Sequence, residues 1–165
     1  MLRLSKKADY ALIAMKHLAQ SASRVEARTR EGGLGAPSAS AREIAEQYDI
    51  PIELLAKVLQ RLVRTGLLAS TQGTRGGYTL SRSPKSISIA DVIQAIDGPV
   101  TVTACSSSEG SNCEQFAKCN VRDPLWRVRE RILSALGECT VAELAADPPG
   151  PPAAAAHAVV LHTHS

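Results

Sequence analysis

Apolar residues recur at three- and four-residue spacing in several stretches of the chain, which predicts amphipathic helices. The first helix is expected over residues 5–20 and begins at Ser5, whose hydroxyl suits an N-cap. Its apolar side consists of aliphatic and small residues: Leu4, Ala8, Ala11, Leu12, Met15 and Leu18. Residues 21–40 interrupt the pattern with Ser, Gly, Pro and mixed charges, so we expect a long, mobile loop there.

Two further helices follow, joined by a tight turn. The run from Ser40 to Glu43 fits a capping box, in which the Ser hydroxyl and the Glu carboxylate each satisfy a free backbone N–H. Pro51 suits the first position of the next helix, where its missing N–H costs nothing. That helix is predicted to turn Leu55, Val58, Leu59 and Leu62 inward and to expose Glu53, Lys57, Gln60, Arg61 and Arg64. The pair is typical of a helix-turn-helix, and equally of an ordinary helical pair with a solvated charged face.

The next segment favours the helix-turn-helix interpretation. Two short predicted strands, Leu67 to Thr71 and Tyr78 to Leu80, flank a glycine-rich turn, and a hairpin in this position is typical of a wing. Glycines there permit close approach to a phosphate or a groove, and Arg75, with Gln72 beside it, can enter a narrow minor groove. Residues 1–85 therefore predict a winged helix-turn-helix that binds duplex DNA, although a purely structural hairpin is the alternative.

The charge distribution agrees with a DNA-binding first half. Residues 1–85 hold 14 Lys and Arg against 7 Asp and Glu, a formal charge of +7, whereas residues 86–165 hold 5 against 9, or −4. A basic half indicates a polyanionic partner, although a solubility bias would look the same. Aromatic residues make up only 3%, which argues against single-strand binding by base stacking.

Several other classes of protein are disfavoured. No apolar run approaches the roughly 20 residues of a membrane helix, and the N-terminus lacks a secretory signal, so we expect a cytoplasmic protein without a membrane partner. There is no phosphate-binding glycine loop, paired carboxylate site or Cys–His nucleophile pattern, and we do not expect an enzyme.

The second half carries the candidate sensor. Cys105, Cys113 and Cys119 follow one another with C-x7-C-x5-C spacing in a polar loop. Soft thiolates favour an iron–sulfur cluster, zinc or copper(I), and the lack of a C-x-x-C pair or a histidine in the loop disfavours zinc. The alternative of free thiols is unattractive, because exposed thiolates oxidise readily.

Helices are expected on both sides of this loop. Ser88 can cap a helix that Gly98 ends, and a second helix at about 123–137 has a long apolar stripe formed by Leu125, Val128, Ile132, Leu133 and Leu136. A small domain does not easily cover such a stripe, so we expect it to pair with a second copy of the chain, packing onto its own domain being the alternative. Thr140 can cap a last short helix. Residues 146–165 are rich in Pro, Ala and His and are expected to form a disordered tail.

The combination resembles the winged-helix iron–sulfur transcription regulators over about residues 1–145. The residues that carry the resemblance are Leu2-Arg3-Leu4-Ser5-Lys6, Asp9-Tyr10-Ala11, Ile44-Ala45, Gly66-Leu67, Gly76-Gly77-Tyr78, the three-cysteine loop and Leu125-Trp126. The resemblance implies a mainly α fold with a small β-wing, in which a winged helix-turn-helix (1–85) is followed by a cluster-binding loop and a long dimerisation helix (86–145). It implies a homodimer that binds a DNA operator as repressor or activator.

The resemblance also implies ligands for a 2Fe–2S or 4Fe–4S cluster. Cys105, Cys113 and Cys119 match the three cysteine ligands of the family. Its cluster-biogenesis members place a histidine three residues after the third cysteine, where this chain has Arg122, which does not ligate. Its nitric-oxide sensors have an acidic residue in the first helix that matches Asp9, so Asp9 of the partner subunit is the leading fourth ligand. Asp123 and Cys139 are weaker candidates, and Asp9 otherwise only favours the positive end of its helix.

We therefore expect a regulator in which cluster loss, oxidation or nitrosylation changes DNA affinity. Two alternatives remain. One is a cluster-free, thiol-based redox regulator in which Cys139 is a candidate resolving cysteine. The other is an iron–sulfur electron carrier or scaffold whose helix-turn-helix binds protein.

Overall fold

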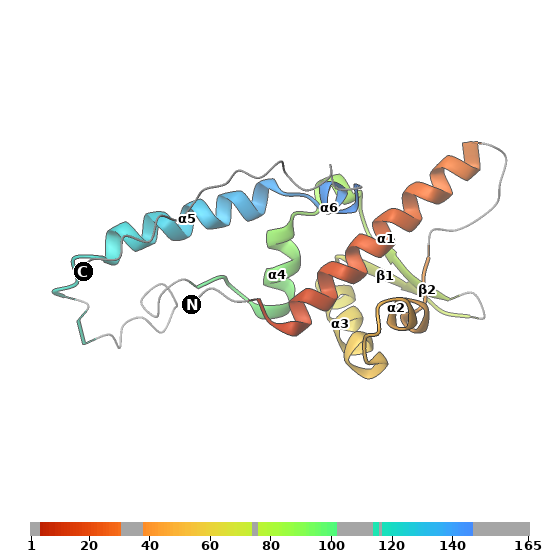
Figure 1. Cartoon of the computed structure of the whole chain (residues 1–165), viewed down its shortest axis with the longest axis horizontal. Helices are drawn as coiled ribbons and strands as arrows, with labels where there is room; N and C mark the ends of the chain where they lie inside the picture. The colour runs from red at the N-terminus through yellow and green to blue at the C-terminus, as the bar shows by residue number, and fades with distance from the viewer. Residues whose placement is uncertain (1–3, 31–37, 74–75, 102–113, 116, 147–165) are drawn as a thin grey trace, which may run out of the picture.

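The computed structural model describes residues 4–30, 38–73, 76–101, 114–115 and 117–146 (Figure 1). Its elements in chain order are α1 (Lys6–Arg30), α2 (Ala41–Gln47), α3 (Ile52–Arg64), β1 (Leu68–Thr71), β2 (Gly77–Leu80), the 3₁₀ turn η1 (Pro84–Ser86), α4 (Ile89–Asp97), α5 (Arg122–Glu138) and α6 (Val141–Ala145). The fold is mainly α-helical with one two-stranded antiparallel sheet, as the sequence predicts. Within the described residues, no helix has the length and apolar content that a membrane crossing requires.

Helix α1 is longer than its sequence pattern predicts. Ser5 caps it as expected, because the Ala8 N–H donates to Ser5 Oγ at 3.1 Å. The helix then continues to Arg30, so the expectation of a loop is wrong for residues 21–30. These ten positions hold no Gly or Pro, and Ala, Arg and Glu among them are good helix formers. The rest of the expected loop, residues 31–37, lies outside the described part of the chain.

The helix-turn-helix and the hairpin form largely where local patterns place them. Ser40 and Glu43 make both hydrogen bonds of the capping box at the start of α2. The turn after α2 contains Asp49 in the left-handed region, with φ of 52°. Pro51 is the N-cap of α3 rather than its first helical residue, which moves the predicted boundary by one position. Strands β1 and β2 pair in antiparallel register, with Leu68 opposite Leu80.

The hydrophobic core does not stop at the domain boundary expected near residue 85. Val92 of α4 and Val141 of α6 are fully buried in the same cluster as Leu18 of α1 and Leu59 of α3. The residue before the N-cap of α4 also pairs with the start of α6 through the backbone, because the Val141 N–H donates to the Ile87 carbonyl at 2.9 Å. Helices of nine and five residues cannot bury an apolar face alone, so both pack on the long α1 helix and join the winged-helix core.

Helix α5 projects from this core as an arm (Figure 1). None of its residues is buried, and the side chains of Trp126 and Val128 are 50% and 44% exposed. The middle of α5 is joined to the segment that follows α4, because Arg129 Nε donates to the Val100 carbonyl at 3.3 Å. The arm agrees with the helix predicted at about 123–137. Its apolar residues Leu125, Ile132, Leu133 and Leu136 are only partly covered within the described chain. The expected tail, apart from Ala146, lies beyond the described residues.

Candidate functional site

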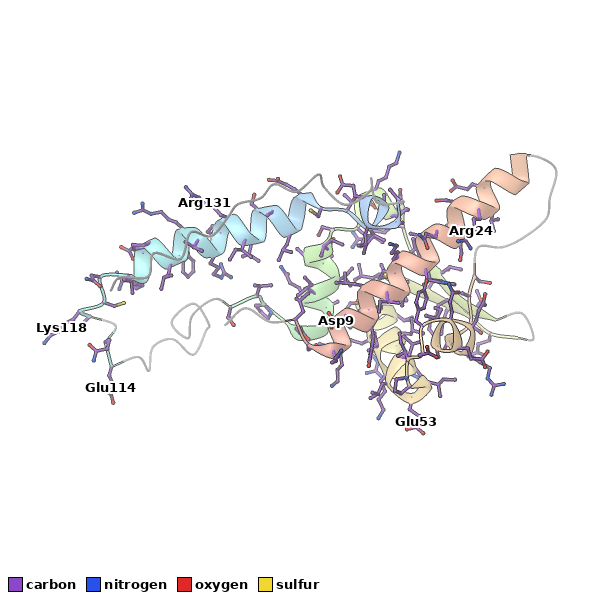
Figure 2. All side chains as sticks on the ribbon, viewed as in Figure 1. Asp9, Arg24, Glu53, Glu114, Lys118 and Arg131 are labelled. Atoms are coloured by element: carbon purple, nitrogen blue, oxygen red, sulfur yellow. The ribbon has the colours of Figure 1, made fainter. Side chains whose placement is uncertain are left out.

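Four polar residues of α3 share its outer face. Glu53, Lys57, Gln60 and Arg64 follow one another at four-, three- and four-residue spacing, and all are exposed. They lie opposite the side of α3 that buries Leu55, Val58, Leu59 and Leu62. Figure 2 shows Glu53 at the tip of α3, pointing away from the core. Since none of the four forms an ion pair within the described residues, their donors and acceptors face solvent, as base and phosphate contacts require.

Arg61 occupies a different place from the one that the sequence predicts. Its side chain is on the flank of α3 that faces α4, and its Nε donates to the Ala95 carbonyl oxygen at 2.9 Å. The residue is still exposed, so it contributes positive charge to the edge of the outer face. It therefore combines a packing contact with a candidate DNA contact.

The glycines of the hairpin turn are required by the protein's own backbone. A Cβ on Gly77 would lie 2.8 Å from the Ala39 carbonyl oxygen, which belongs to the segment that bridges β2. A Cβ on Gly76 would lie 2.4 Å from the backbone carbonyl oxygen of Thr71 across the turn. These two glycines therefore have a steric role within the protein, and the groove approach expected from the sequence stays a prediction. Gln72 is exposed beside this turn, whereas Arg75 lies outside the described residues.

The start of α1 is joined to the end of α4. The backbone N–H and the hydroxyl of Ser5 both donate to the carboxylate of Asp97. Asp97 is the last residue of α4, and the chain continues from there through Gly98 towards the cysteine segment. This contact places the N-terminus of α1 beside the end of α4, and Lys7 lines a pocket there together with residues of α3. Sequence reasoning missed Lys7, because no local pattern relates it to residues of α3 some fifty positions later.

The cysteine ligands predicted from the sequence are only partly described. Cys105 and Cys113 lie outside the described residues, whereas Cys119 is a partly exposed free thiol just before α5. Among the described residues, no three His, Cys, Asp or Glu side chains lie close enough to hold a metal ion. The donor chemistry still suits an iron–sulfur cluster, because a thiolate at Cys119 is soft and accessible.

Asp9 and Cys119 of one chain do not lie together. Figure 2 shows Asp9 on α1 at the centre of the molecule and Lys118, the neighbour of Cys119, at the far end of the α5 arm. A ligand set that contains both residues therefore needs Asp9 from a second chain. Asp123, the other acidic candidate, lies in the first turn of α5 and accepts a hydrogen bond from Arg122 Nε at 3.0 Å.

Cys139 is an exposed free thiol at the opposite end of α5 from Cys119. The 17-residue helix between them spans about 25 Å. A disulfide needs Cα atoms within about 7 Å. With α5 intact, Cys139 cannot act as the resolving partner of Cys119 in the same chain.

His17 is a buried polar residue that sequence reasoning did not single out. Its side chain lies between α1 and α2, with Nδ1 3.3 Å from the Tyr48 hydroxyl and the two rings edge to face. Its Nε2 has no hydrogen-bond partner among the residues that the structure describes. Burial lowers the pKa of His17 from its usual 6.5, with a smaller contribution from Arg24, while the charge of Glu43 opposes the shift. We expect a neutral imidazole that packs α2 against α1.

The known proteins that this chain resembles are regulators. The model of the Rrf2 family, described as an iron-dependent transcriptional regulator, matches residues 4–147. The HTH-type transcriptional regulator IscR of Xenorhabdus nematophila is 35% identical over 144 residues, which cover 87% of this chain and 79% of that protein. The structure of CymR, the global cysteine regulator of B. subtilis, superposes with a TM-score of 0.64 at 28% identity and covers 88% of this chain and 97% of that one. T. potens IscR gives a TM-score of 0.61 at 26% identity, covering 87% and 85% of the two chains.

Proposed function

The chain belongs to the Rrf2 family of transcriptional regulators, and from this premise we propose that it binds a DNA operator as a homodimer and responds to a cysteine-ligated iron–sulfur cluster. The family favours regulation over the electron-carrier alternative and over an enzyme. The proposal has three parts, which are the DNA contacts, the dimer and the sensor.

The observation that carries the proposal is the outer face of α3. This face presents Glu53, Lys57, Gln60 and Arg64 without ion pairs in the described part of the chain, on the helix that follows a tight turn from α2. In a helix-turn-helix this second helix enters the major groove, where carboxylate and amide groups read base edges and cations meet phosphates. The hairpin beside it, with Gln72 and Arg75, then contacts the neighbouring minor groove.

The α5 arm supports a homodimer. Its exposed apolar residues, among them Val121, Trp126 and Val128, form a surface that a second α5 helix would cover. A symmetric dimer presents two α3 helices and reads two half-sites of a palindromic operator. A ligand role for Asp9 requires that this dimer also bring α1 of one chain within reach of α5 of the other.

For the sensor, we assign Cys105, Cys113 and Cys119 as thiolate ligands and Asp9 of the second chain as the fourth ligand. The bound cluster would supply a centre that responds to iron supply and oxidants. The segment that carries the cysteines joins α4 to α5 and therefore connects the DNA-binding core to the dimer arm. A change in this segment would alter the spacing of the two α3 helices and hence the affinity for DNA.

A thiol-based redox regulator is the second candidate. The accessible thiols of Cys119 and Cys139 favour this alternative. The structural likeness to the global cysteine regulator of B. subtilis also supports it. Because α5 separates Cys119 from Cys139 within one chain, the thiol switch would use Cys105 or Cys113, or a cysteine of the second chain.

The deciding experiment is an ultraviolet–visible spectrum of anaerobically purified protein, with iron, sulfide and DNA affinity measured on the same sample. Visible absorption with matching iron and sulfide, lost in Cys119→Ala and weakened in Asp9→Ala, is the expected result. Cys139→Ala serves as the matched control and should keep the cluster. A colourless protein that remains iron-free after anaerobic reconstitution would refute the cluster and leave the thiol switch.

A further inference from the structure

A pocket of about 320 Å³ opens between the start of α1, the flank of α3 and the end of α4. Lys7 of α1 and Lys57, Arg61 and Arg64 of α3 supply its charge, and no acidic residue lines it. None of these four cations forms an ion pair within the described part of the chain. Like charges this close repel one another, so a bound anion would relieve the repulsion.

The pocket lies at the side of α3, where Lys57 and Arg64 form the edge of the outer face. Arg61 marks this side, since its Nε is held by the Ala95 carbonyl of α4 at 2.9 Å. Its four other N–H groups make no hydrogen bond among the described residues and are free to bind an anion. When a helix occupies the major groove, a sugar–phosphate backbone runs along each of its sides. A pocket on this flank is therefore aligned with the backbone of one strand.

The floor of the pocket indicates what accompanies the anion. Leu54, Val58 and Ile96 line it, and Leu54 is 41% exposed although it is a large apolar residue. A small inorganic anion would leave this apolar surface in water. A nucleotide unit fits better, because its phosphate matches the cationic rim and its deoxyribose offers C–H groups to the apolar floor.

We propose that this pocket binds one phosphodiester group and the adjoining deoxyribose of the operator, with Lys7 as a phosphate contact supplied by α1. The inference rests on the proposed DNA-binding function and adds a contact outside the helix-turn-helix. Phosphate contacts set the position of a protein on the duplex without reading sequence. Because Ser5 and Asp97 tie the start of α1 to the end of α4, the bound backbone would touch the same elements that lead to the cysteine segment.

The test compares Lys7→Gln with Lys6→Gln in the full-length protein. Both substitutions remove one positive charge from exposed neighbouring positions of α1, but only Lys7 lines the pocket. Fluorescence anisotropy with a labelled duplex would measure the affinity between about 50 and about 200 mM salt. The loss of one phosphate contact should reduce the salt slope by about one, so the advantage of the wild type over Lys7→Gln shrinks about threefold across this range. Lys6→Gln should keep the wild-type slope.

A second measurement locates the phosphate. Single methylphosphonate substitutions, which remove the charge of one phosphate, are moved along each strand of the bound duplex. The wild type and Lys6→Gln should lose affinity at one flanking position at which Lys7→Gln is insensitive.

The outcomes separate the two proposals. If the wild type binds no duplex at any salt concentration, the DNA-binding function fails and this inference fails with it. If the wild type binds but Lys6→Gln and Lys7→Gln behave alike, only the phosphate pocket is refuted. A small anionic effector as the true occupant would give this second result, because DNA affinity would then not depend on Lys7.

Discussion

The continuity of the core across residue 85 predicts that the winged-helix segment does not fold alone. A fragment of residues 1–85 lacks Ile87, Val92 and Val141, each fully buried in the core cluster of the complete chain. Burial of an aliphatic side chain of this size contributes about 1.5–3 kcal/mol, so the three contribute on the order of 5–9 kcal/mol. This figure is an upper estimate, because a denatured chain already buries part of its apolar surface. Domains of this kind have a total stability of only about 5–15 kcal/mol.

We therefore expect the 1–85 fragment to be unfolded or marginally stable, whereas a fragment of residues 1–146 should unfold cooperatively. Far-ultraviolet circular dichroism in a urea titration measures both, and the titration is repeated at several protein concentrations because α5 remains in the longer fragment. Cooperative unfolding of the 1–85 fragment with the same midpoint as the longer one would refute the reasoning. It would show that α4 and α6 are separate from the core.

Three further predictions concern single side chains. Burial lowers the pKa of His17 in the folded protein, so the unfolded chain binds a proton on this side chain first as the pH falls. The free energy of unfolding should therefore decrease below about pH 6.5. Urea midpoints measured above and below this pH should show the decrease in the wild type and not in His17→Leu. Gly77→Ala places a Cβ 2.8 Å from the Ala39 carbonyl oxygen and should lower the stability by about 1–3 kcal/mol. Gly137→Ala, in open space on α5, should raise the stability by about 0.5–1 kcal/mol. Equal effects of the two substitutions in thermal unfolding would contradict the steric role of Gly77. Arg61→Ala should lower both DNA affinity and stability, the latter by about 1 kcal/mol through loss of the bond to Ala95, whereas Arg64→Ala should lower DNA affinity and leave the melting temperature unchanged.

Local signals of the sequence predicted most of the elements and the exposed outer face of α3, whose contact with DNA stays a prediction. The capping boxes that start at Ser40 and Thr140 are read correctly, since each involves residues only three positions apart. The inward face of α3 also follows from the sequence, because helical periodicity alone separates its buried leucines from Glu53 and Lys57. The end of α1 was predicted wrongly for the opposite reason: mixed charge looks like a loop, but a segment without Gly or Pro continues a helix that tertiary contacts already hold.

The relations between distant segments depended on the tertiary structure. Arg61 was assigned to DNA alone because the carbonyl that binds it belongs to Ala95, 34 positions later. Lys7 joins the cations of α3, and Val141 joins the core, through packing that no local pattern encodes. Periodicity, caps and turns are decided by neighbours along the chain and can be read from the sequence. Contacts between segments depend on how helices of given lengths cover one another's apolar faces, and only the folded chain settles which side chains then meet.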